Sequence, residues 1–461
     1  MTRQVVVIGG GLAGLTAALA LADSGVQVTL LEARPRLGGA ATSFSRGDLT
    51  IDNGQHVFLR CCTSYQQLLS RLGVTSQVAI QDRFDVTVLS PGGPARLRRS
   101  ALPGPLHLGR ALAGYRLLPL ADRLTVGRAA LAMRALDPAD PAVDAQALGP
   151  WLAAQGQRET TRRLLWDLFT VSALNIAGDD ASLALAATVI KTGLLGASDA
   201  ADIGISRVPL GNLHDHAASA ALSKAGAQVR LGSKATAVRP LAGGRFAVHA
   251  GQELVEADGV VLAAPPAQAA RLAGPAGVIG AGRWDGLGAA PIVNVHVRYD
   301  RPVMDLPFAA AVQSPVQWVF DKTRSAGLAR GQYLAISLSA ADEYVDTPAA
   351  SLREQFIPAL EQLFPAAADA SVTDFFVTRE RRATFRQAPG TGALRPGTAT
   401  AVPGLVLAGA WTDTGWPDTM EGAVRSGQHA AEQMTGWLAR QPDTDQRESR
   451  AATAAPTGAA S

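Results

Sequence analysis

Apolar runs of two different kinds alternate along this chain. Residues 5–8 and 26–31 are short runs rich in β-branched side chains, which is typical of strands buried in a parallel sheet. Between them, residues 15–22 consist mainly of Leu and Ala, which favour a helix. Because strand, helix and strand follow one another directly, the pattern predicts a βαβ unit at the start of the chain.

Later segments continue both patterns and predict an α/β protein. Helices are expected over the ranges 102–136 (two helices interrupted near Pro119), 151–174, 181–195, 212–226 and 351–363. Strands are expected over the ranges 227–231, the next run containing Val238, 246–250, 260–264, 292–297, 318–320, 333–339, 371–378 and a run that begins at Leu405. The run 49–58 has a polar centre with Gly54, so a strand is expected to break into a turn there.

The turn after the first strand carries the spacing G-x-G-x-x-G at Gly9, Gly11 and Gly14. The first glycine permits the bend, the second lets the main chain approach a pyrophosphate, and the third lets helix and strand pack closely. The second strand ends near Glu32, whose carboxylate can accept hydrogen bonds from a ribose diol. An ordinary glycine turn is the alternative, but the order of strand, turn, helix, strand and acid favours dinucleotide binding.

A second glycine element indicates which dinucleotide is bound. Its pattern is R-x-G-G, with Arg36, Gly38 and Gly39. The adjacent glycines let the chain pass close to a pyrophosphate, and Arg36 adds positive charge there. The element resembles the FAD-binding start of the amine oxidase and phytoene desaturase superfamily. This resemblance implies FAD, and a Rossmann-like FAD-binding domain with an interwoven α+β substrate domain. A surface turn with a solvated arginine is the alternative.

The turn in the run 49–58 reads D-x-G-x-H-x-F, which is a further resemblance to this superfamily. In relatives this turn lies against the isoalloxazine ring, so Gly54, Gln55 and His56 are expected beside the flavin. His56 titrates near neutral pH and is the first candidate for a proton donor, with Asp52 as the second. A structural, hydrogen-bonded histidine is the alternative for His56.

A strand from Leu405 leads into Gly409, and a helix opens near Thr419 and Met420. Amides at the start of this helix can point at the pyrimidine and ribityl oxygens of a flavin. The run resembles the C-terminal FAD motif of carotenoid and squalene-pathway desaturases, with Ala410 where relatives often carry an acid. No cysteine lies in this run, so the FAD is expected to be non-covalent.

Two further positions carry expectations of their own. In relatives, the main chain at the position of Val238 contacts adenine. Glu421 resembles a catalytic carboxylate, but it can equally cap the helix that it starts.

Motifs between the two ends narrow the resemblance. They are W-D-L-F-T-V-S-A-L-N from Trp166, R-V-P-L from Arg207, Q-W-V-F-D from Gln317, R-R-A-T-F from Arg381 and R-P at Arg395. With the FAD motifs they resemble the hydroxysqualene dehydroxylase family of bacterial hopanoid pathways, over nearly the whole chain. The resemblance implies a long-chain isoprenoid substrate, and reductive removal of an allylic hydroxyl group by reduced FAD.

Such a reaction passes through a delocalised cation, which aromatic faces can shelter. The candidates, each with core packing as the alternative, are Trp166, Phe169, Trp318 and Trp416. Three other functions stay open: a carotenoid (phytoene-type) desaturase, a flavin amine oxidase and a non-enzymatic prenyl-chain carrier. No second nucleotide-binding unit is found, so the electron donor is open between transiently bound NADPH and a separate reductase.

A chain of 461 residues is too long for one ordinary core and predicts two interwoven domains. The FAD-binding domain is expected over 1–95, 200–285 and 395–440, and the substrate-binding domain over 96–199 and 286–394. Residues 441–461 lack hydrophobic periodicity and are expected to be disordered.

Composition and charge limit the partners. The net charge is +3 and no dense basic block occurs, so nucleic acid is not expected. Cys61 and Cys62 are adjacent, which excludes a disulfide framework and a C-x-x-C metal site, so no metal is expected and a cytoplasmic location fits. No apolar run reaches the roughly 20 residues of a transmembrane helix.

Arginines recur among leucines over residues 102–136. This pattern is typical of an amphipathic surface that contacts lipid, or of core-facing helices with a solvated side. Because a C30 polyene is nearly insoluble in water, a transient contact with the inner face of the membrane is favoured.

Overall fold

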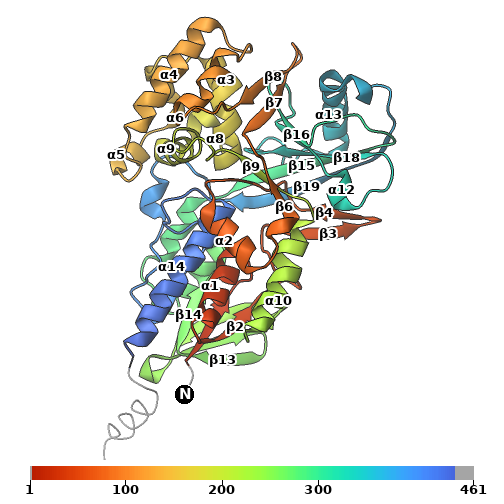
Figure 1. The fold of residues 1–461 in the computed structure, drawn as a ribbon. Helices are drawn as coiled ribbons and strands as arrows, with labels where there is room; N and C mark the ends of the chain where they lie inside the picture. Colours follow the sequence, from red (N-terminus) through yellow and green to blue (C-terminus); the bar gives the residue numbers. More distant parts are fainter. Residues whose placement is uncertain (1–2, 442–461) are drawn as a thin grey trace, which may run out of the picture.

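Five parallel strands form the sheet at the base of the structure, a computed structural model that describes residues 3–441 (Figure 1). Their order across the sheet is β10 (Gln228–Arg230), β2 (Gln27–Leu31), β1 (Gln4–Ile8), β14 (Gly259–Leu262) and β20 (Leu405–Leu407). This order confirms the predicted βαβ unit and the Rossmann-like sheet. The predicted disordered tail lies outside the described residues, apart from Gln441.

Different elements cover the two faces of this sheet, because side chains alternate along each strand. Val5 and Val7 face α1 (Leu12–Asp23), α2 (Thr63–Arg71), α10 (Ala217–Lys224) and α14 (Met420–Ala439). Val6 and Ile8 face α11 (Pro266–Ala273) and an antiparallel sheet of β11 (Ala235–Pro240), β12 (Phe246–Ala250) and β13 (Glu253–Ala257). Because β1 is buried on both faces, its residues 5–8 are all apolar and do not alternate with polar ones.

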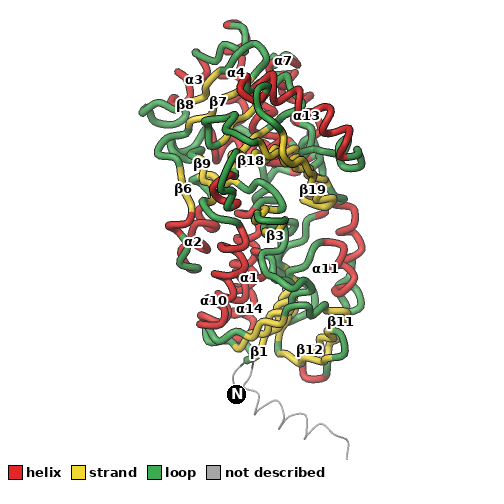
Figure 2. Tube along the Cα trace, turned by 90° about the vertical axis from the view of Figure 1, so that its right-hand side faces the viewer, coloured by secondary structure: helices red, strands yellow, loops and turns green. Residues whose placement is uncertain are grey.

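A seven-stranded sheet crosses the upper half of the molecule (Figures 1 and 2). Its order is β19 (Val372–Thr384), β15 (Ala290–Tyr299), β18 (Gln332–Leu338), β17 (Trp318–Asp321), β16 (Phe308–Ala311), β7 (Asp85–Leu89) and β8 (Ala95–Arg98). Helix α13 (Ala349–Leu363) packs on the face that carries Val293 and Val295. From the opposite face Asn294 donates to the carbonyl of Asn53, which follows the hairpin of β3 (Ser43–Arg46) and β4 (Leu49–Asp52).

Short helices form the rest of the upper half. They are α3 (Gly109–Ala113), α4 (Leu120–Arg134), α5 (Pro141–Asp144), α6 (Leu148–Ala154), α7 (Glu159–Thr161), α8 (Asp167–Leu174), α9 (Leu183–Val189) and, beside β18, α12 (Thr323–Ala326). The predicted break near Pro119 is confirmed. The single helix predicted over 151–174 is wrong, because Gly156 adopts a left-handed conformation (φ +78°) and ends α6. None of the helices between residues 3 and 441 combines the length and apolar character needed to cross a bilayer.

One predicted domain bound needs correction. Residues up to 95 were expected in the FAD-binding domain, but β7 and β8 belong to the seven-stranded sheet because β7 pairs in parallel with the distant β16. The chain crosses between the two halves at a small sheet of β5 (Val57–Leu59), β9 (Ile203–Ser206) and β6 (Val78–Ile80). The other domain bounds stay predictions.

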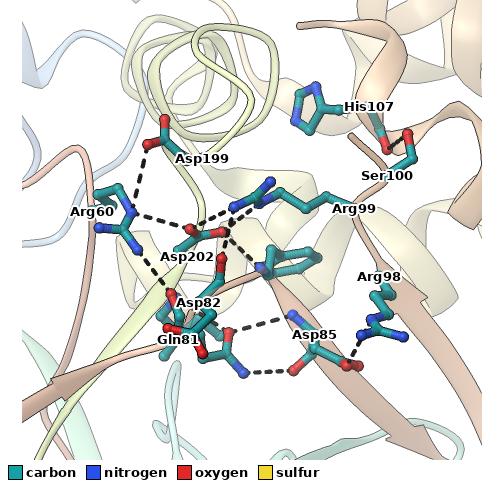
Figure 3. A network of polar contacts seen from close by, with 12 residues as sticks. Arg60, Gln81, Asp82, Asp85, Arg98, Arg99, Ser100, His107, Asp199 and Asp202 are labelled. Carbon is teal, nitrogen blue, oxygen red and sulfur yellow. Dashed lines mark hydrogen bonds and ion pairs between the residues drawn. The ribbon is translucent and has the colours of Figure 1, made fainter. Parts of the chain in front are cut away.

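A buried carboxylate fastens this crossing point (Figure 3). Asp202 is fully buried, forms ion pairs with Arg99 (2.7 Å) and Arg60 (3.1 Å), and accepts a hydrogen bond from the amide of Phe84 (2.6 Å). Burial alone raises the pKa of Asp202, but the hydrogen bonds from these donors outweigh it, so the pKa lies below its usual range. The neighbouring His107 is also buried, and this burial lowers the pKa of its ring.

Candidate functional site

The first glycine turn has the geometry of a phosphate-binding loop. Gly9 ends β1 with φ +112°, and a side chain there would collide with the carbonyl of Ala263. A side chain at Gly14 would overlap the carbonyl of Gly9. Helix α1 starts after Gly11 with no side-chain cap and no acid in its first turn. Its first amides therefore remain available to an anion, as a pyrophosphate requires.

The second glycine loop lies directly across the first. The amide of Gly38 donates to the carbonyl of Gly10 (2.9 Å), and a side chain at Gly39 would come within 2.8 Å of the Gly11 Cα. Arg36 carries a buried Nε that has no hydrogen-bond partner among the described residues. A buried guanidinium N–H without a partner costs free energy unless a ligand accepts a hydrogen bond from it. A phosphate oxygen is such an acceptor.

Glu32 is buried at the end of β2. One carboxylate oxygen accepts from the amide of Gly10 (2.6 Å) and the other from the amide of Arg34 (2.7 Å). These contacts fix the carboxylate and still leave a lone pair on each oxygen, since each can accept more than one hydrogen bond. The geometry suits the predicted contact with a ribose diol.

The segment just before the strand of Val238 contacts Glu32, but Val238 itself does not. Ser233 donates its amide to the Glu32 carbonyl (2.8 Å), whereas Val238 is fully buried and pairs with Val248 inside the small sheet. An open groove of about 550 Å³ runs along residues 230–236 and 250–253. The adenine contact at Val238 stays a prediction, and the groove marks the adjacent surface.

The turn after β4 packs on the glycine loops. Asn53 donates its side-chain amide to the carbonyl of Ala40 (2.7 Å) and accepts from the amide of Thr42 (3.0 Å). The Nε2 atom of Gln55 is buried with no partner among residues 3–441. Like Arg36, Gln55 therefore carries a donor that a ligand can satisfy, which is consistent with its predicted place beside the flavin.

Asp52 is held by three donors, two of them from distant segments. It is buried and forms an ion pair with Lys322 (2.9 Å), and it accepts hydrogen bonds from Ser43 Oγ (2.7 Å) and the amide of Leu210 (2.8 Å). Three donors stabilise the charged form of a carboxyl group. The geometry therefore argues against Asp52 as a proton donor and assigns it to joining β4, the segment before α10 and the segment before α12.

His56 lies next to this ion pair. Burial is the largest influence and lowers the pKa of His56, while Asp52 raises it and Lys322 lowers it. A neutral imidazole therefore dominates at neutral pH, which makes His56 a poor acid there. Gly54 leaves room for the ring, because a side chain at Gly54 would lie 3.2 Å from the His56 Nε2.

The C-terminal motif closes the site from the other side. Gly409 has φ +144°, and a side chain there would collide with the indole of Trp411. Thr419 is the N-cap of α14, and its Oγ1 accepts from the amide of Gly422 (3.2 Å). Thr419 and Met420 thus lie at the start of a helix that begins beside the carboxyl edge of the parallel sheet, where ligands bind in such folds.

The expectation that Glu421 caps its own helix is wrong. Glu421 accepts from the amides of Ser64 (3.2 Å) and Tyr65 (2.8 Å), so it caps α2 instead, and it also pairs with Arg425. The fold thereby brings the start of α14 close to the segment of Cys61 and Cys62, which precedes α2. A sequence separation of more than 350 residues concealed this proximity.

Two side chains that support the site were not predicted from the sequence or were noted only within a motif. His214 is fully buried, donates Nδ1–H to the carbonyl of Ala41 (2.9 Å) and accepts from the Tyr65 hydroxyl at Nε2 (2.8 Å). Burial lowers the pKa of His214 to about 4. Arg395, noted only within an R-P motif, donates to the carbonyls of Ala410 (3.1 Å) and Trp416 (2.8 Å). His214 thus holds the second glycine loop in place, and Arg395 holds the loop that follows Gly409.

An apolar cavity of about 300 Å³ lies among the helices of the upper half. Its walls come from α3, α4, α8, the two π-helical turns Arg162–Trp166 and Ile190–Leu194, and the strands that precede them. Trp166 and Phe169 line it, whereas the indole of Trp318 donates to Ser172 (2.7 Å) and Trp416 stacks under Arg425 (4.5 Å). Two of the four predicted aromatic residues therefore face this cavity.

Residues 12–435 match the family model described as flavin containing amine oxidoreductase. The chain belongs to this family. It is 31% identical to the hydroxysqualene dehydroxylase of Rhodopseudomonas palustris, over 94% of this chain and 98% of that protein. It is 24% identical to the zeta-carotene desaturase of Arabidopsis thaliana, over 98% of this chain and 89% of that protein. The predicted superfamily, and its hydroxysqualene dehydroxylase branch, are confirmed.

Solved structures show the same fold. An oxidoreductase from Methanosarcina mazei superposes with a TM-score of 0.73 at 19% identity, covering 93% of this chain and all of that chain. A putrescine oxidase gives a TM-score of 0.68 at 20% identity, covering 95% of this chain and 99% of that one. With the family membership, these likenesses establish the protein as a flavin-dependent oxidoreductase of the predicted fold class.

Proposed function

We propose that this protein is an FAD-dependent hydroxysqualene dehydroxylase, which replaces an allylic hydroxyl group of a C30 isoprenoid by hydrogen. The observation that carries the proposal is the 31% identity to the enzyme of that name over 94% of this chain. The zeta-carotene desaturases are less similar, at 24–25% identity.

The residues of the site suit a non-covalent FAD. The amides after Gly11 and the guanidinium of Arg36 would hold the pyrophosphate, Glu32 the ribose, and the segments 54–56 and 419–420 the ring. The unpaired donors of Arg36 and Gln55 support this assignment because a bound cofactor would satisfy both. When bound and reduced, FAD supplies a hydride.

The apolar cavity supports a hydrocarbon substrate. Leucines, Trp166 and Phe169 form most of its wall, and such a lining excludes water from a reactive carbocation. Aromatic faces also stabilise a nearby positive charge without reacting with it. The reaction removes the hydroxyl group as water and delivers a hydride to the allylic carbon, so the product is squalene.

The decisive test is the product formed from 12-hydroxysqualene without oxygen, after chemical reduction of the flavin. We expect squalene in amounts that match the reduced flavin consumed. Lengthened conjugation of phytoene by the oxidised enzyme would instead support a desaturase, and peroxide release with amines an amine oxidase. A purified protein without flavin absorbance would support the prenyl-chain carrier. Release of the flavin on denaturation tests whether the FAD is bound without a covalent link. This measurement matters because Cys61 and Cys62 lie close to the start of α14.

The same proposal includes delivery of the substrate from a membrane surface. Large exposed leucines gather on the segment that surrounds the cavity: Leu102 (51% exposed), Leu106 (62%), Leu120 (73%), Leu124 (81%) and Leu131 (63%). Leu106 and Leu131 also line the cavity. Exposed arginines accompany them, and the single acid of α3 and α4, Asp122, is buried in an ion pair with Arg158. Apolar and cationic groups together suit an anionic bilayer.

Co-sedimentation with vesicles tests this surface. The wild type should bind vesicles that contain phosphatidylglycerol better than pure phosphatidylcholine vesicles. The double variant Leu124→Ser/Leu131→Ser should lose about tenfold or more in binding, because each inserted leucine contributes about 1.5–3 kcal/mol when fully buried. Leu254→Ser, which changes another exposed leucine (54% exposed) on β13, is the control. Equal losses in both variants would refute a localised membrane contact.

A further inference from the structure

A carboxyl group lies where the cofactor half meets the helices around the apolar cavity. Asp418 immediately precedes Thr419, the N-cap of α14, whose first turn points toward the upper half (Figure 1). Its Oδ2 accepts from the amide of Phe385 (2.8 Å), and its own amide donates to Gln387 Oε1 (3.0 Å). Gln387 in turn donates to the carbonyl of Leu174, at the end of α8 (2.7 Å). The Phe385 amide thus holds the carboxyl group, while Gln387 connects the main chain of Asp418 to the end of α8.

The surroundings of Asp418 keep it partly protonated. Burial raises the pKa of Asp418 to about 6, against the opposing effects of the Phe385 amide and Arg395. On the neighbouring segments, Arg386 pairs with Asp342 and Glu421 with Arg425, while Arg382 is exposed. Asp413, in the loop between β20 and α14, is exposed. Only Oδ2 has a hydrogen-bond partner among the described residues, so Oδ1 is left for a proton and a ligand.

The reaction needs such a group. A hydroxyl group leaves an allylic carbon readily only after it has been protonated, so the acid must hold a proton near neutral pH. Asp52 pairs with Lys322 and accepts from two further donors, and burial lowers the pKa of His56. Asp167 is the other aspartate with its pKa raised to about 6, but it packs against Gly178 and Asp179 on the helical side of the upper half.

We propose that Asp418 is the acid that protonates the departing hydroxyl group. The inference rests on the proposed dehydroxylation. The carboxyl proton passes to the hydroxyl oxygen, the C–O bond breaks with its electron pair going to oxygen, and water leaves. Bound FAD, reduced by an external two-electron reductant such as dithionite, would supply the hydride that the allylic cation takes up. The Asp418 carboxylate, adjacent to the cation in the meantime, regains a proton from water.

A substrate with a better leaving group isolates this step. The acetate ester of the same alcohol needs no full proton transfer, because acetate leaves as a stable anion. With the alcohol, Asp418→Asn should lower the single-turnover rate by about 10²–10⁴-fold, the usual contribution of a general acid. With the ester, the same variant should lose less than about tenfold. Asp167→Asn, which removes the other raised carboxyl group, should retain the wild-type rate on both substrates.

Two further readouts separate acid catalysis from a structural role. The rate with the alcohol should fall as the pH rises above about 6, where Asp418 loses its proton. Asp418→Glu should show the same fall in rate, with its midpoint at a different pH. Infrared difference spectra should show a protonated carboxyl band that titrates near pH 6 and is missing in Asp418→Asn. Flavin content and thermal unfolding verify that the variant is folded.

Other outcomes are equally informative. Equal losses of Asp418→Asn on alcohol and ester, or an unchanged carboxyl band in this variant, would overturn the role of Asp418. A wild-type enzyme that converts neither substrate would refute the dehydroxylation itself, while the infrared band would still report on the protonation of Asp418.

Discussion

The cofactor loops and the Asp202 network both bury polar groups, but they satisfy them differently. Around Asp202, two arginines and a main-chain amide occupy the carboxylate oxygens (Figure 3). In the cofactor loops, Arg36 Nε and Gln55 Nε2 have no partner within residues 3–441. A buried donor left unpaired costs about 1–3 kcal/mol, so such groups persist where a ligand completes them. The Asp202 carboxylate is fully paired, whereas both ring nitrogens of the neighbouring His107 have no partner among the described residues, so an unpaired buried group indicates a binding site here only where it lies beside a glycine loop.

The largest effect is expected at the structural joint. Asp202→Asn should lower the free energy of unfolding by about 3–5 kcal/mol, because it leaves buried arginine charge without its partner. Chemical unfolding of the flavin-free protein measures this loss. Asp23→Asn removes the exposed pair with Arg71 (2.7 Å) and, as the control, should cost no more than about 1 kcal/mol. Similar losses of unfolding free energy in both variants would show that the Asp202 network contributes no more to stability than an exposed ion pair.

A pH effect should follow from His214, the neutral group that holds the second glycine loop. Its pKa is about 4 in the fold, against 6.5 for an unperturbed histidine, so only the unfolded chain takes up the proton between these values. Stability should therefore fall as the pH drops from 6.5 toward 4, by about 1.4 kcal/mol per pH unit and about 3 kcal/mol in total. Urea unfolding across this range should show a shallower slope for His214→Gln. The exposed His216→Gln is the control, and an identical slope in His214→Gln would contradict the assignment.

Arg36→Gln should affect the cofactor and not the fold. Loss of a charge-assisted hydrogen bond to phosphate should weaken FAD binding by about 1.5–3 kcal/mol, or roughly 10–150-fold. Titration of the flavin-free protein with FAD measures the affinity, and unfolding without FAD should be unchanged. If Arg36→Gln destabilised the flavin-free protein as Asp202→Asn does, the unpaired Nε would be a structural feature after all.

The smallest effect is expected at Gly39, where the two glycine loops touch. Gly39→Ala places a side chain in the left-handed region (φ +59°), at a cost of about 1–2 kcal/mol, and crowds Gly11. FAD affinity should fall by a similar amount in titrations of the flavin-free protein. Gly282→Ala, where nothing lies within 4 Å and φ is ordinary, should leave the affinity unchanged.

The cofactor loops could be predicted from the sequence because each is a local motif. Gly9, Gly11 and Gly14 are close in the chain and form a recognisable spacing, and the contact of Gly14 with the Gly9 carbonyl is itself local, although Gly9 is restricted by the distant Ala263. The surroundings of the candidate acids could not be predicted, for the opposite reason. Asp52 and His56 had suitable residue types, but Lys322 and the burial around them come from distant segments. The domain bound at residue 95 failed likewise, because β7 pairs with a strand more than 200 residues away.

By itself, the sequence determined the parallel sheet, the two glycine loops and the choice of flavin, since short-range sterics and strand periodicity decide these features. Only the tertiary structure decided which carboxyl groups are charged. Asp202 meets Arg99 across 103 residues, and Glu421 meets α2 across more than 350. A pKa depends on the charges, donors and solvent around a group, and residues far apart in the chain supply them. The raised pKa of Asp418 is therefore a property of the folded chain alone.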